Sequence, residues 1–375
     1  MKVVTIVGTR PELIKLSRVI AEFDEAFDHV LVHTGQNYDW ELNGIFFSEM
    51  GIRKPDHFLD IRAATPSGAV ARVIERVDTL LTELRPDALV LLGDTNSCLA
   101  AYPAKRHKIP IFHMEAGNRC FDVRVPEEIN RPIIDHLSDI NLPYTEHARR
   151  LLLAEGLRPE TLIVTGSPMR EVLDHHKDAI AASTMPRVLG LEKGKYFIWS
   201  SHREENIDNT QNLTHLIETL HTLVATWNIP VIFSAHPRTQ KRLEGMRLAL
   251  PKLVYLHKPF GFFDYIKLQC NALCTLSDSG TLTEESSLLD FSAVMLRNTH
   301  ERPEGMDEGT VIMSGIKQEH VRMAVQMAIR HRTDDGKRQF RMISAYEPTN
   351  VSRKVARIVL SYTPYINSNI WHKSY

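Results

Sequence analysis

Short apolar runs alternate with segments of helical periodicity along almost the whole chain. The run Val3–Val7 leads through a glycine-containing turn into apolar residues at helical spacing, and this order of strand, turn and helix recurs. The further candidate strands are His29–Thr34, Ala88–Leu92, Ile109–Phe112, Asp139–Leu142, Leu162–Thr165, Tyr196–Trp199, Val231–Ser234, Leu253–Leu256, Ala272–Leu276 and Ala293–Leu296. The candidate helices include Ala69–Leu84, Leu213–Thr226 and Val351–Tyr362. Such alternation predicts an α/β fold built on doubly wound parallel sheets.

The length of the chain indicates two domains. At 375 residues it exceeds what one ordinary hydrophobic core holds, because a domain contains about 150 residues. The segment 177–195 has no clear periodicity and is the predicted linker. We therefore expect a Rossmann-like domain over residues 1–176, a second one over residues 177–349, and a cleft between them. The last helix, at about 350–375, is a candidate to pack back on the first domain.

Composition excludes several classes of protein. Apolar residues make up 43% of the chain and charged residues 24%, as in soluble globular proteins, and no run of about 18 apolar residues could span a membrane. The first residues lack the features of a secretory signal, so we expect a cytoplasmic protein. A net charge of -1 is not the basic footprint of a nucleic-acid binder. The four scattered cysteines indicate neither a disulfide framework nor a metal site.

Acidic side chains follow two successive candidate strands. Asp94 comes after Ala88–Leu92, and Glu115 comes after the next candidate strand. Ligands of open α/β sheets bind outside the carboxyl ends of the strands, so both carboxylates are candidates for chemistry, although Asp94 could equally cap a helix. Glu127 and Arg131 lie four residues apart on one face of a predicted helix, where the alternative is a surface ion pair. The recurrence of acidic groups at strand ends favours a site over a solvated surface.

The turn after the first strand has the features of an anion site. Gly8, Thr9 and Arg10 lead into a helix, whose free backbone N–H groups and positive dipole end favour a negative ligand. Lys15 adds positive charge further along the helix. The turn is neither a Walker A loop nor the G-x-G-x-x-G dinucleotide fingerprint. The alternative is a plain turn with a solvated arginine.

Polar motifs also follow the strands of the second domain. His202 and His236 each come after a strand and close to an arginine, and this repeated placement favours phosphate binding or proton transfer over a structural role. Ser279 and Gly280 precede a helix, where small residues let backbone N–H groups approach a phosphate. Glu285 lies a turn deeper and could accept hydrogen bonds from ribose hydroxyl groups. The alternative for this last motif is a capped helix with a solvated acidic first turn.

These motifs together resemble those of the non-hydrolysing UDP-N-acetylglucosamine 2-epimerase family, and the resemblance runs nearly end to end. The shared motifs are Gly8-Thr9-Arg10-Pro11-Glu12, Gly93-Asp94-Thr95, Glu115-Ala116-Gly117, Pro126-Glu127-Glu128-Ile129-Asn130-Arg131, His202-Arg203-Glu204, Asp278-Ser279-Gly280 with Glu284-Glu285, and Glu301-Arg302-Pro303-Glu304. The resemblance implies a fold of the glycosyltransferase B type, in which two Rossmann-like domains hold UDP in the cleft between them. It also implies a homodimer.

The resemblance assigns roles to individual residues. The residues that it implies in catalysis are Asp94, Glu115, Glu127, Arg131 and His202. The residues that it implies in substrate binding are Arg10, Lys15, His236, Phe262, Ser279, Gly280, Glu285 and Arg302. The implied reaction expels UDP from a UDP-sugar to give a 2-acetamidoglycal, and then adds UDP back after C2 has been protonated from the opposite face. The resemblance implies neither a cofactor nor a metal.

The loop between Glu115 and Glu127 departs from the commonest members of that family, which carry a longer loop. Residues 117–125 look like those of a branch that converts UDP-2-acetamido-2,6-dideoxy-L-talose to UDP-N-acetyl-L-fucosamine, a precursor of capsule or O-antigen sugars. The alternative within the family is a UDP-N-acetylglucosamine 2-epimerase that forms UDP-N-acetylmannosamine, and motifs do not separate either from a hydrolysing epimerase. A UDP-sugar glycosyltransferase or a non-catalytic UDP-sugar sensor would not need the acidic residues of the first domain. Residues 35–39 differ from the region of allosteric UDP-sugar regulation in other members, so such regulation is not implied.

Overall fold

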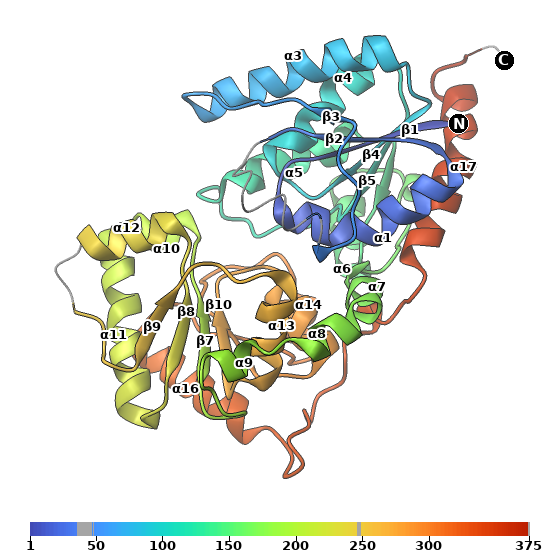
Figure 1. Cartoon of the computed structure of the whole chain (residues 1–375). Coiled ribbons are helices and arrows are strands. Elements are labelled where there is room, and N and C mark those ends of the chain that lie inside the picture. Colours follow the sequence, from blue (N-terminus) through green and yellow to red (C-terminus); the bar gives the residue numbers. More distant parts are fainter. Residues whose placement is uncertain (36–46, 48, 246–248, 374–375) are drawn as a thin grey trace. The chain divides into compact units, whose positions relative to one another are not determined.

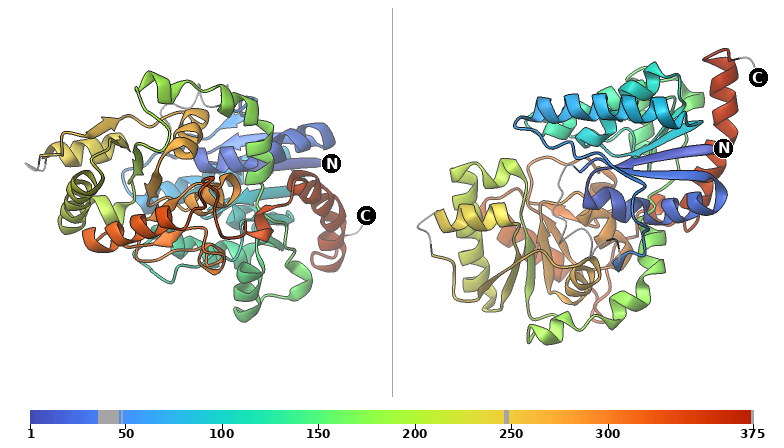
Figure 2. Two further views of the ribbon diagram at one scale, coloured as in Figure 1. Left: turned by 90° about the horizontal axis from the view of Figure 1, so that it is seen from below. Right: turned by 45° about the horizontal axis from the view of Figure 1, so that its top comes forward.

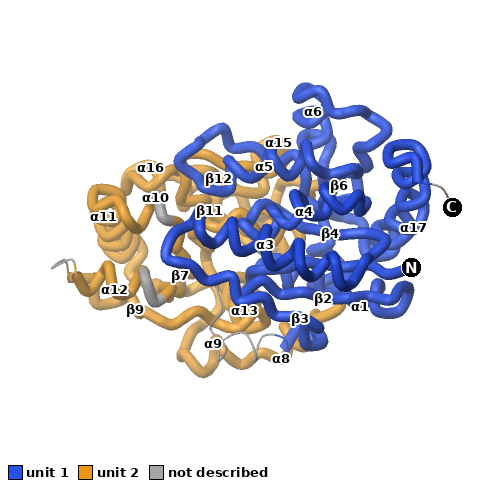
Figure 3. Tube along the Cα trace, turned by 90° about the horizontal axis from the view of Figure 1, so that it is seen from above, with its two compact units in different colours: residues 1–174, 345–375 blue, residues 175–344 orange. Residues whose placement is uncertain are grey.

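The computed structural model describes residues 1–35, 47, 49–245 and 249–373. The chain divides into two compact units, which Figure 3 colours separately. Unit 1 comprises residues 1–174 and 345–375, and unit 2 comprises residues 175–344. Most of the segment compared above with a regulatory region, residues 36–39, lies outside the described residues.

Unit 1 is built on a parallel sheet with six strands among the described residues (Figure 1). The strands are β1 (Lys2–Val7), β2 (Asp28–His33), β3 (His57–Phe58), β4 (Ala88–Leu92), β5 (Ile111–Met114) and β6 (Ile140–Leu142), in the order β3-β2-β1-β4-β5-β6. β1 and β4 are almost wholly buried, as central strands of a sheet covered on both faces should be. The strand order reverses between β1 and β4, and ligands of such folds bind at the carboxyl ends of the strands at this reversal.

The helices of unit 1 cover this sheet. They are α1 (Arg10–Ala26), α3 (Pro66–Leu84), α4 (Ala101–Arg106), α5 (Pro126–Leu137), α6 (Glu146–Ala154), α7 (Met169–His175) and α17 (Val351–Asn369), with short 3-10 helices at Asn96–Ala100 and Pro159–Thr161. α3 buries Val73, Val77 and Leu80 at helical spacing, and these side chains join the apolar core that includes Val4 and Leu89 of the sheet. α17, at the end of the chain, packs against α1 (Figures 1 and 2).

Unit 2 has the same architecture. Its strands are β7 (Phe197–Ser200), β8 (Val231–Ser234), β9 (Val254–His257), β10 (Cys274–Ser277), β11 (Ala293–Met295) and β12 (Ile312–Met313), in the parallel order β12-β11-β10-β7-β8-β9. Its helices are α8 (Lys177–Ala182), α9 (Met185–Val188), α10 (Glu204–Ile207), α11 (Thr210–Trp227), α12 (Pro237–Gly245), α13 (Phe262–Asn271), α14 (Leu282–Leu289), α15 (Glu304–Asp307) and α16 (Gln318–Arg330). A 3-10 helix at Ser344–Tyr346 leads out of the unit. Trp199, Phe233 and Leu220 lie in its main apolar core.

The structure confirms the predicted α/β fold with doubly wound parallel sheets. The candidate strand Leu162–Thr165 is wrong, because within the described residues it forms only an isolated bridge to Asn141. The predicted linker 177–195 is not irregular, since it contains α8 and α9, which pack against α13. β3 and β12 were not expected, because strands of two residues at a sheet edge carry no periodic pattern. No helix in the described part of the chain combines the length and the apolar composition needed to cross a bilayer.

The chain returns to unit 1 close to Gly166. The backbone N–H of Ser167 donates to the carbonyl oxygen of Ala345 at 3.2 Å. Gly166 has a φ of +86°, and a Cβ there would lie 2.9 Å from that same carbonyl oxygen and 2.9 Å from Cγ of Pro348. Glycine at 166 therefore permits both a left-handed backbone and the close approach of the returning segment.

We predict that Gly166→Ala destabilises the protein more than Gly156→Ala does. Gly156 has nearly the same φ, +87°, but a Cβ there would meet nothing within 4 Å. Both variants place alanine in the left-handed region, at a cost of about 1 kcal/mol, and only Gly166→Ala must also displace the Ala345 carbonyl, which adds about 1–3 kcal/mol. Urea unfolding measures both losses. Equal losses of unfolding free energy would contradict the close approach.

Candidate active site

Carboxylates gather at the carboxyl ends of two adjacent strands in unit 1. Asp94 lies two residues after β4, and Glu115 directly follows its parallel neighbour β5. Burial raises the pKa of the Cys98 thiol, and the negative charges of Glu12, Asp94 and Glu115 raise it further. Because the charges of all three carboxylates influence the pKa of one buried thiol, these carboxylates lie in the same region of unit 1.

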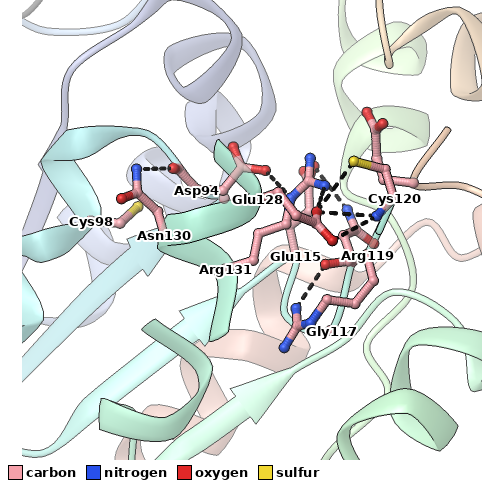
Figure 4. Close-up of polar contacts among 12 residues, drawn as sticks. Asp94, Cys98, Glu115, Gly117, Arg119, Cys120, Glu128, Asn130 and Arg131 are labelled. Atoms are coloured by element: carbon pink, nitrogen blue, oxygen red, sulfur yellow. Dashed lines mark hydrogen bonds and ion pairs between the residues drawn. The ribbon is translucent and has the colours of Figure 1, made fainter. Parts of the chain in front are cut away.

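Arg131 orients Asp94. Its Nε donates to Oδ2 of Asp94 at 2.7 Å, and its Nη1 lies 2.5 Å from Oε2 of Glu128, so the guanidinium joins two carboxylates (Figure 4). Asn130 donates to the backbone carbonyl of Asp94 at 2.9 Å. The Arg131 side chain is 5% exposed, whereas that of Asp94 is 23% exposed. α5 therefore fixes Asp94 from its buried side and leaves part of the carboxylate accessible.

Glu128, the neighbour of the predicted Glu127, fixes the turn at Cys120 and Phe121. Its carboxylate accepts hydrogen bonds from the backbone N–H groups of both residues at 2.7–3.1 Å. Burial alone would raise the pKa of Glu128, but these N–H groups and Arg131 hold it below its usual value. Glu127 is half-buried in the first turn of α5. Glu128 thus connects the loop to Arg131.

Lys15 reaches Glu115 from α1. Its Nζ lies 2.5 Å from Oε2 of Glu115, and both side chains are largely buried. Glu115 has a φ of +64°, a conformation that costs a residue with a side chain about 1 kcal/mol, so its surroundings must hold it. Such backbone strain is concentrated at functional sites. The structure therefore places Lys15 beside Glu115, whose backbone is held in this strained conformation.

Glu12 caps the start of α1, next to the predicted anion site. Its carboxylate accepts hydrogen bonds from the backbone N–H groups of Gly8 and Thr9 and from the hydroxyl of Thr95. A capping box formed by the chain's own carboxylate thus uses the N–H groups of the two residues before the helix, and the anion site at the helix start stays a prediction. Burial raises the pKa of Glu12 to about 7, against the opposing effect of these hydrogen bonds. Arg10 is half-buried in the same turn, and burial lowers its pKa although the charge of Glu49 opposes that shift.

Asp278 organises the second group of polar residues, in unit 2. This residue directly follows β10. Its carboxylate accepts hydrogen bonds from the backbone N–H groups of His202 and Arg203 at 3.0–3.2 Å. It also accepts hydrogen bonds from the Ser201 hydroxyl at 3.0 Å and from the Asn206 amide at 3.1 Å. Nδ1 of His202 lies 3.2 Å away. Burial opposes ionisation, but His202 and the other donors hold the pKa of Asp278 well below its usual range. The His202 side chain is half exposed, so Asp278 presents it to solvent from a buried anchor.

Ser279 and Gly280 lie just before α14, as the motif predicts. A Cβ at Gly280 would clash with the carboxylate of Glu301. Glu301 is itself held by Arg297 at 2.7 Å and by Arg203 at 3.5 Å, so it cannot easily give way. The absence of a side chain at Gly280 therefore keeps this turn close to Glu301.

The other predicted binding residues of unit 2 differ in their surroundings. Glu285 is buried and accepts a hydrogen bond from Gln269 at 2.8 Å. Arg302 is buried too, and its Nη2 lies 3.1 Å from a carboxylate oxygen of Glu284. The remaining two are His236, which is exposed after β8, and Phe262, which is buried in the first turn of α13. Arg302 and Glu284 thus form a buried ion pair between α14 and the turn before α15.

Glu12, Glu128 and Asp278 contribute to the geometry of the site although sequence patterns alone do not assign them a role. Position offers a signal for two of them: Glu12 stands at the third position of a capping box, and Asp278 directly follows a strand. The sequence gives no such signal for Glu128, because its contacts form only when the loop has folded. In the described part of the chain, no three His, Cys, Asp or Glu side chains are placed to hold a metal ion.

Known proteins resemble this chain over most of its length. Residues 21–360 match the family described as UDP-N-acetylglucosamine 2-epimerase. The structure of a UDP-N-acetylglucosamine 2-epimerase from Rickettsia bellii is 52% identical, with 100% of both chains covered and a TM-score of 0.93. That of the Methanocaldococcus jannaschii UDP-GlcNAc 2-epimerase in complex with UDP-GlcNAc and UDP is 31% identical over 96% of this chain and 100% of its own, with a TM-score of 0.89. A UDP-2,3-diacetamido-2,3-dideoxy-D-glucuronate 2-epimerase of Pseudomonas aeruginosa is 34% identical over 84% of this chain and 88% of its own.

We predict that Glu12 makes stability depend on pH. The folded state holds the Glu12 proton with a pKa of about 7, against an ordinary value of 4.5, so between these values the unfolded state ionises first. The unfolding free energy should therefore fall as pH rises from about 4.5 to about 7, by up to about 3 kcal/mol. Glu12→Gln keeps the shape and removes the titration, so in urea unfolding the variant should gain stability relative to the wild type over this range. A stability difference that stays constant with pH would contradict the raised pKa.

Proposed function

The chain belongs to the UDP-N-acetylglucosamine 2-epimerase family, and we propose that it is an isomerase that inverts C2 of a UDP-linked 2-acetamido sugar. One observation carries this proposal. Asp94 and Glu115 lie at the ends of neighbouring strands in unit 1, each beside a cation that is largely buried. A protein that only binds a UDP-sugar, or that transfers the sugar to an acceptor, would not need this acidic pair.

The chemistry of the substrate requires such groups. The hydrogen at C2 of a 2-acetamido sugar is not adjacent to a carbonyl, so a single base cannot remove it through an enolate. Neither unit opens with the G-x-G-x-x-G fingerprint that would support oxidation by a dinucleotide. We therefore favour elimination, in which the bond from C1 to the diphosphate oxygen breaks as a carboxylate accepts the C2 proton, giving UDP and a 2-acetamidoglycal. Protonation of C2 from the opposite face and attack of UDP at C1 then complete the inversion.

The two units supply different parts of this reaction. In the proposal Asp94, Glu115 and Glu127 transfer protons, and Arg131 and Lys15 hold the first two carboxylates in place. In unit 2, His202, Ser279 and Gly280 bind the departing diphosphate, with Arg10 of unit 1 adding positive charge. Each preorganised donor of this kind stabilises the developing negative charge by about 3 kcal/mol. Glu285, His236, Phe262 and Arg302 complete the proposed set of binding residues.

We further propose that the substrate is UDP-2-acetamido-2,6-dideoxy-L-talose and the product is UDP-N-acetyl-L-fucosamine, a precursor of capsule or O-antigen sugars. Support comes from the loop that precedes α5, where the side chains of Phe121 and Val123 are each 77% exposed. Such apolar groups could cover the C6 methyl of a 6-deoxy sugar. The family resemblance also supports a homodimer that acts in the cytoplasm.

A specific observation favours a second substrate, UDP-N-acetylglucosamine. The Rickettsia bellii structure, 52% identical to this chain, carries the name of a UDP-N-acetylglucosamine 2-epimerase. Incubation with each UDP-sugar in heavy water, followed by NMR of the products, decides between the two. Deuterium incorporated at C2 of an inverted product supports the proposed function, whereas unlabelled or uninverted sugar in both reactions would overturn it.

We predict that Asp94→Asn and Glu115→Gln each lower kcat by about 100-fold or more, because each removes a proton-transfer group. UDP should still bind, since its diphosphate is held mainly by other residues, and calorimetry tests this separately. Asp78→Asn is the control, because Asp78 is an exposed carboxylate on α3 that pairs with His107. Unchanged turnover in either variant would remove that residue from the catalytic set.

We predict that Phe121→Ser combined with Val123→Ser lowers the preference for the 6-deoxy substrate. Contact with one methyl group contributes about 1–3 kcal/mol to discrimination, which corresponds to roughly 10- to 200-fold in relative kcat/KM. Both side chains are exposed, so the stability of the fold should change little. Val188→Ser, an equally conservative change at an exposed position of unit 2, is the control. If the double variant keeps the substrate preference of the wild type, the loop does not take part in recognising the C6 methyl group.

A further inference from the structure

Asp135 is a buried carboxylate to which the proposed reaction assigns no role. It lies on α5, and its side chain is 1% exposed. One oxygen lies 2.9 Å from Nδ1 of His113, and the other lies 2.7 Å from Nη2 of Arg119. The backbone N–H of Gly117 donates to both oxygens, at 3.2 and 3.3 Å. One carboxylate thus joins β5 to the turn that follows it.

His113 extends this network to the turn that carries Asp94. Its Nε2 lies 2.7 Å from the carbonyl oxygen of Gly93, the residue before Asp94. A carbonyl can only accept, so Nε2 is the donor in this hydrogen bond. The N–H of Gly93 donates in turn to the carbonyl of Met114 at 3.0 Å. Gly93 is therefore held to β5 by both of its backbone polar groups, and Asp94 projects from a fixed position.

Glu115 lies between two partners of Asp135. His113 precedes it by two residues and Gly117 follows it by two residues, and both Glu115 and Gly117 have left-handed backbones, with φ of +64° and +81°. A left-handed glutamate persists only where its surroundings fix it. The hydrogen bonds from Gly117 to Asp135 anchor the far end of this turn, while β5 anchors its near end.

The charge of Asp135 is well compensated. Burial alone would raise its pKa, but His113 and Arg119 hold the pKa below its usual value. The ionised carboxylate can only accept hydrogen bonds. The Arg119 guanidinium and the Gly117 N–H donate to it, and because Nε2 of His113 already donates to Gly93, Nδ1 donates to Asp135 only when the ring is doubly protonated. Removal of the charge would therefore leave buried donors without an acceptor.

We propose that Asp135 is a positioning residue that fixes the turns of Glu115 and Asp94, the first through Gly117 and the second through His113 and Gly93. The inference rests on the proposed function, in which these two carboxylates are among the groups that transfer protons at C2. Catalytic acids and bases must be held to within about 0.5 Å of the positions in which they can transfer a proton to or from the substrate. Asp135 contacts both supports and therefore couples the two positions.

Asp139 provides a matched control. It is also a carboxylate of unit 1 with a side chain that is 1% exposed, four residues further along the chain. It accepts hydrogen bonds from the backbone N–H of Ile111 at 2.9 Å and from Lys105 at 2.6 Å. Those partners lie at the opposite end of β5 and on α4, away from the turns of Asp94 and Glu115. Asp139→Asn therefore disturbs a buried carboxylate without disturbing the proposed supports.

The experiment compares Asp135→Asn with Asp139→Asn in the full-length protein. The readouts are kcat, KM, UDP affinity and the ratio of released 2-acetamidoglycal to epimerised product. Misplacement by about 1 Å can cost 100-fold in rate, so Asp135→Asn should lower kcat by that order and raise the ratio, because glycal that is not protonated promptly escapes. UDP affinity should not change, and Asp139→Asn should keep the wild-type ratio. A purely structural role would lower the amount of active protein and leave the ratio unchanged, which would overturn the proposal.

Two additions keep the outcome decisive. If Asp135→Asn does not fold, His113→Asn replaces it. The Asn amide can lie near the position of Nδ1 but is too short to reach the carbonyl of Gly93, so this variant breaks the connection to Gly93 and leaves the hydrogen bonds from Gly117 to Asp135 in place. It should raise the same ratio. Amide hydrogen exchange tests the supports without any assumption about the reaction, and exchange at Gly117 should be faster in Asp135→Asn than in Asp139→Asn. Equal exchange would overturn the positioning role. A wild-type protein that epimerises neither UDP-sugar would instead overturn the proposed function alone.

Discussion

The described part of unit 1 depends on the way in which it stabilises negative charge at the carboxyl edge of its parallel sheet. A carboxylate that leaves water costs several kcal/mol unless cations or N–H donors replace the lost hydration. Asp94 has Arg131 and Glu115 has Lys15. Glu12 has N–H and hydroxyl donors at the start of α1, but these do not offset its burial, and its pKa is raised to about 7. Each of these interactions also confines a carboxylate to one orientation. The interactions that make burial tolerable are therefore the same ones that preorganise acid–base chemistry.

Unit 2 uses the same physical device for a different purpose. Its sheet has the same strand topology, but the anchor there is a single buried carboxylate, Asp278, which collects the N–H groups of the loop after β7 and orients His202. At the end of β10 this acidic anchor is followed by two small residues, Ser279 and Gly280. The two units thus share one architecture and carry different residues at the ends of their strands. Their chemistry follows from the residues at the strand ends and not from the fold itself.

The sheets could be predicted from the sequence because strands buried on both faces read as continuous apolar runs, of which Ala88–Leu92 is an example. The edge strands β3 and β12 could not be predicted, because a strand of two residues is too short to show a periodic pattern of apolar residues. The site was predictable where it depended on position after a strand, as for Asp94, and not where it depended on folded contacts. Glu128 is an example, because its contacts with Arg131 and with the N–H groups of the 120–121 turn depend on the folded loop. Likewise, the hydrogen bonds from the N–H groups of Gly8 and Thr9 to Glu12 are seen only in the folded helix start.

The central claim is that the bond between C1 and the diphosphate breaks before the configuration at C2 changes, with the carboxylates of unit 1 moving the proton. Positional isotope exchange tests this claim most directly. A UDP-sugar labelled with heavy oxygen in the bridge between C1 and the β-phosphate would be incubated with the protein, and the remaining substrate would be examined by phosphorus NMR. If UDP is expelled and added back, rotation of the freed phosphate moves the label into non-bridging positions during turnover. Epimerisation that proceeds with the label still wholly in the bridge would contradict the account.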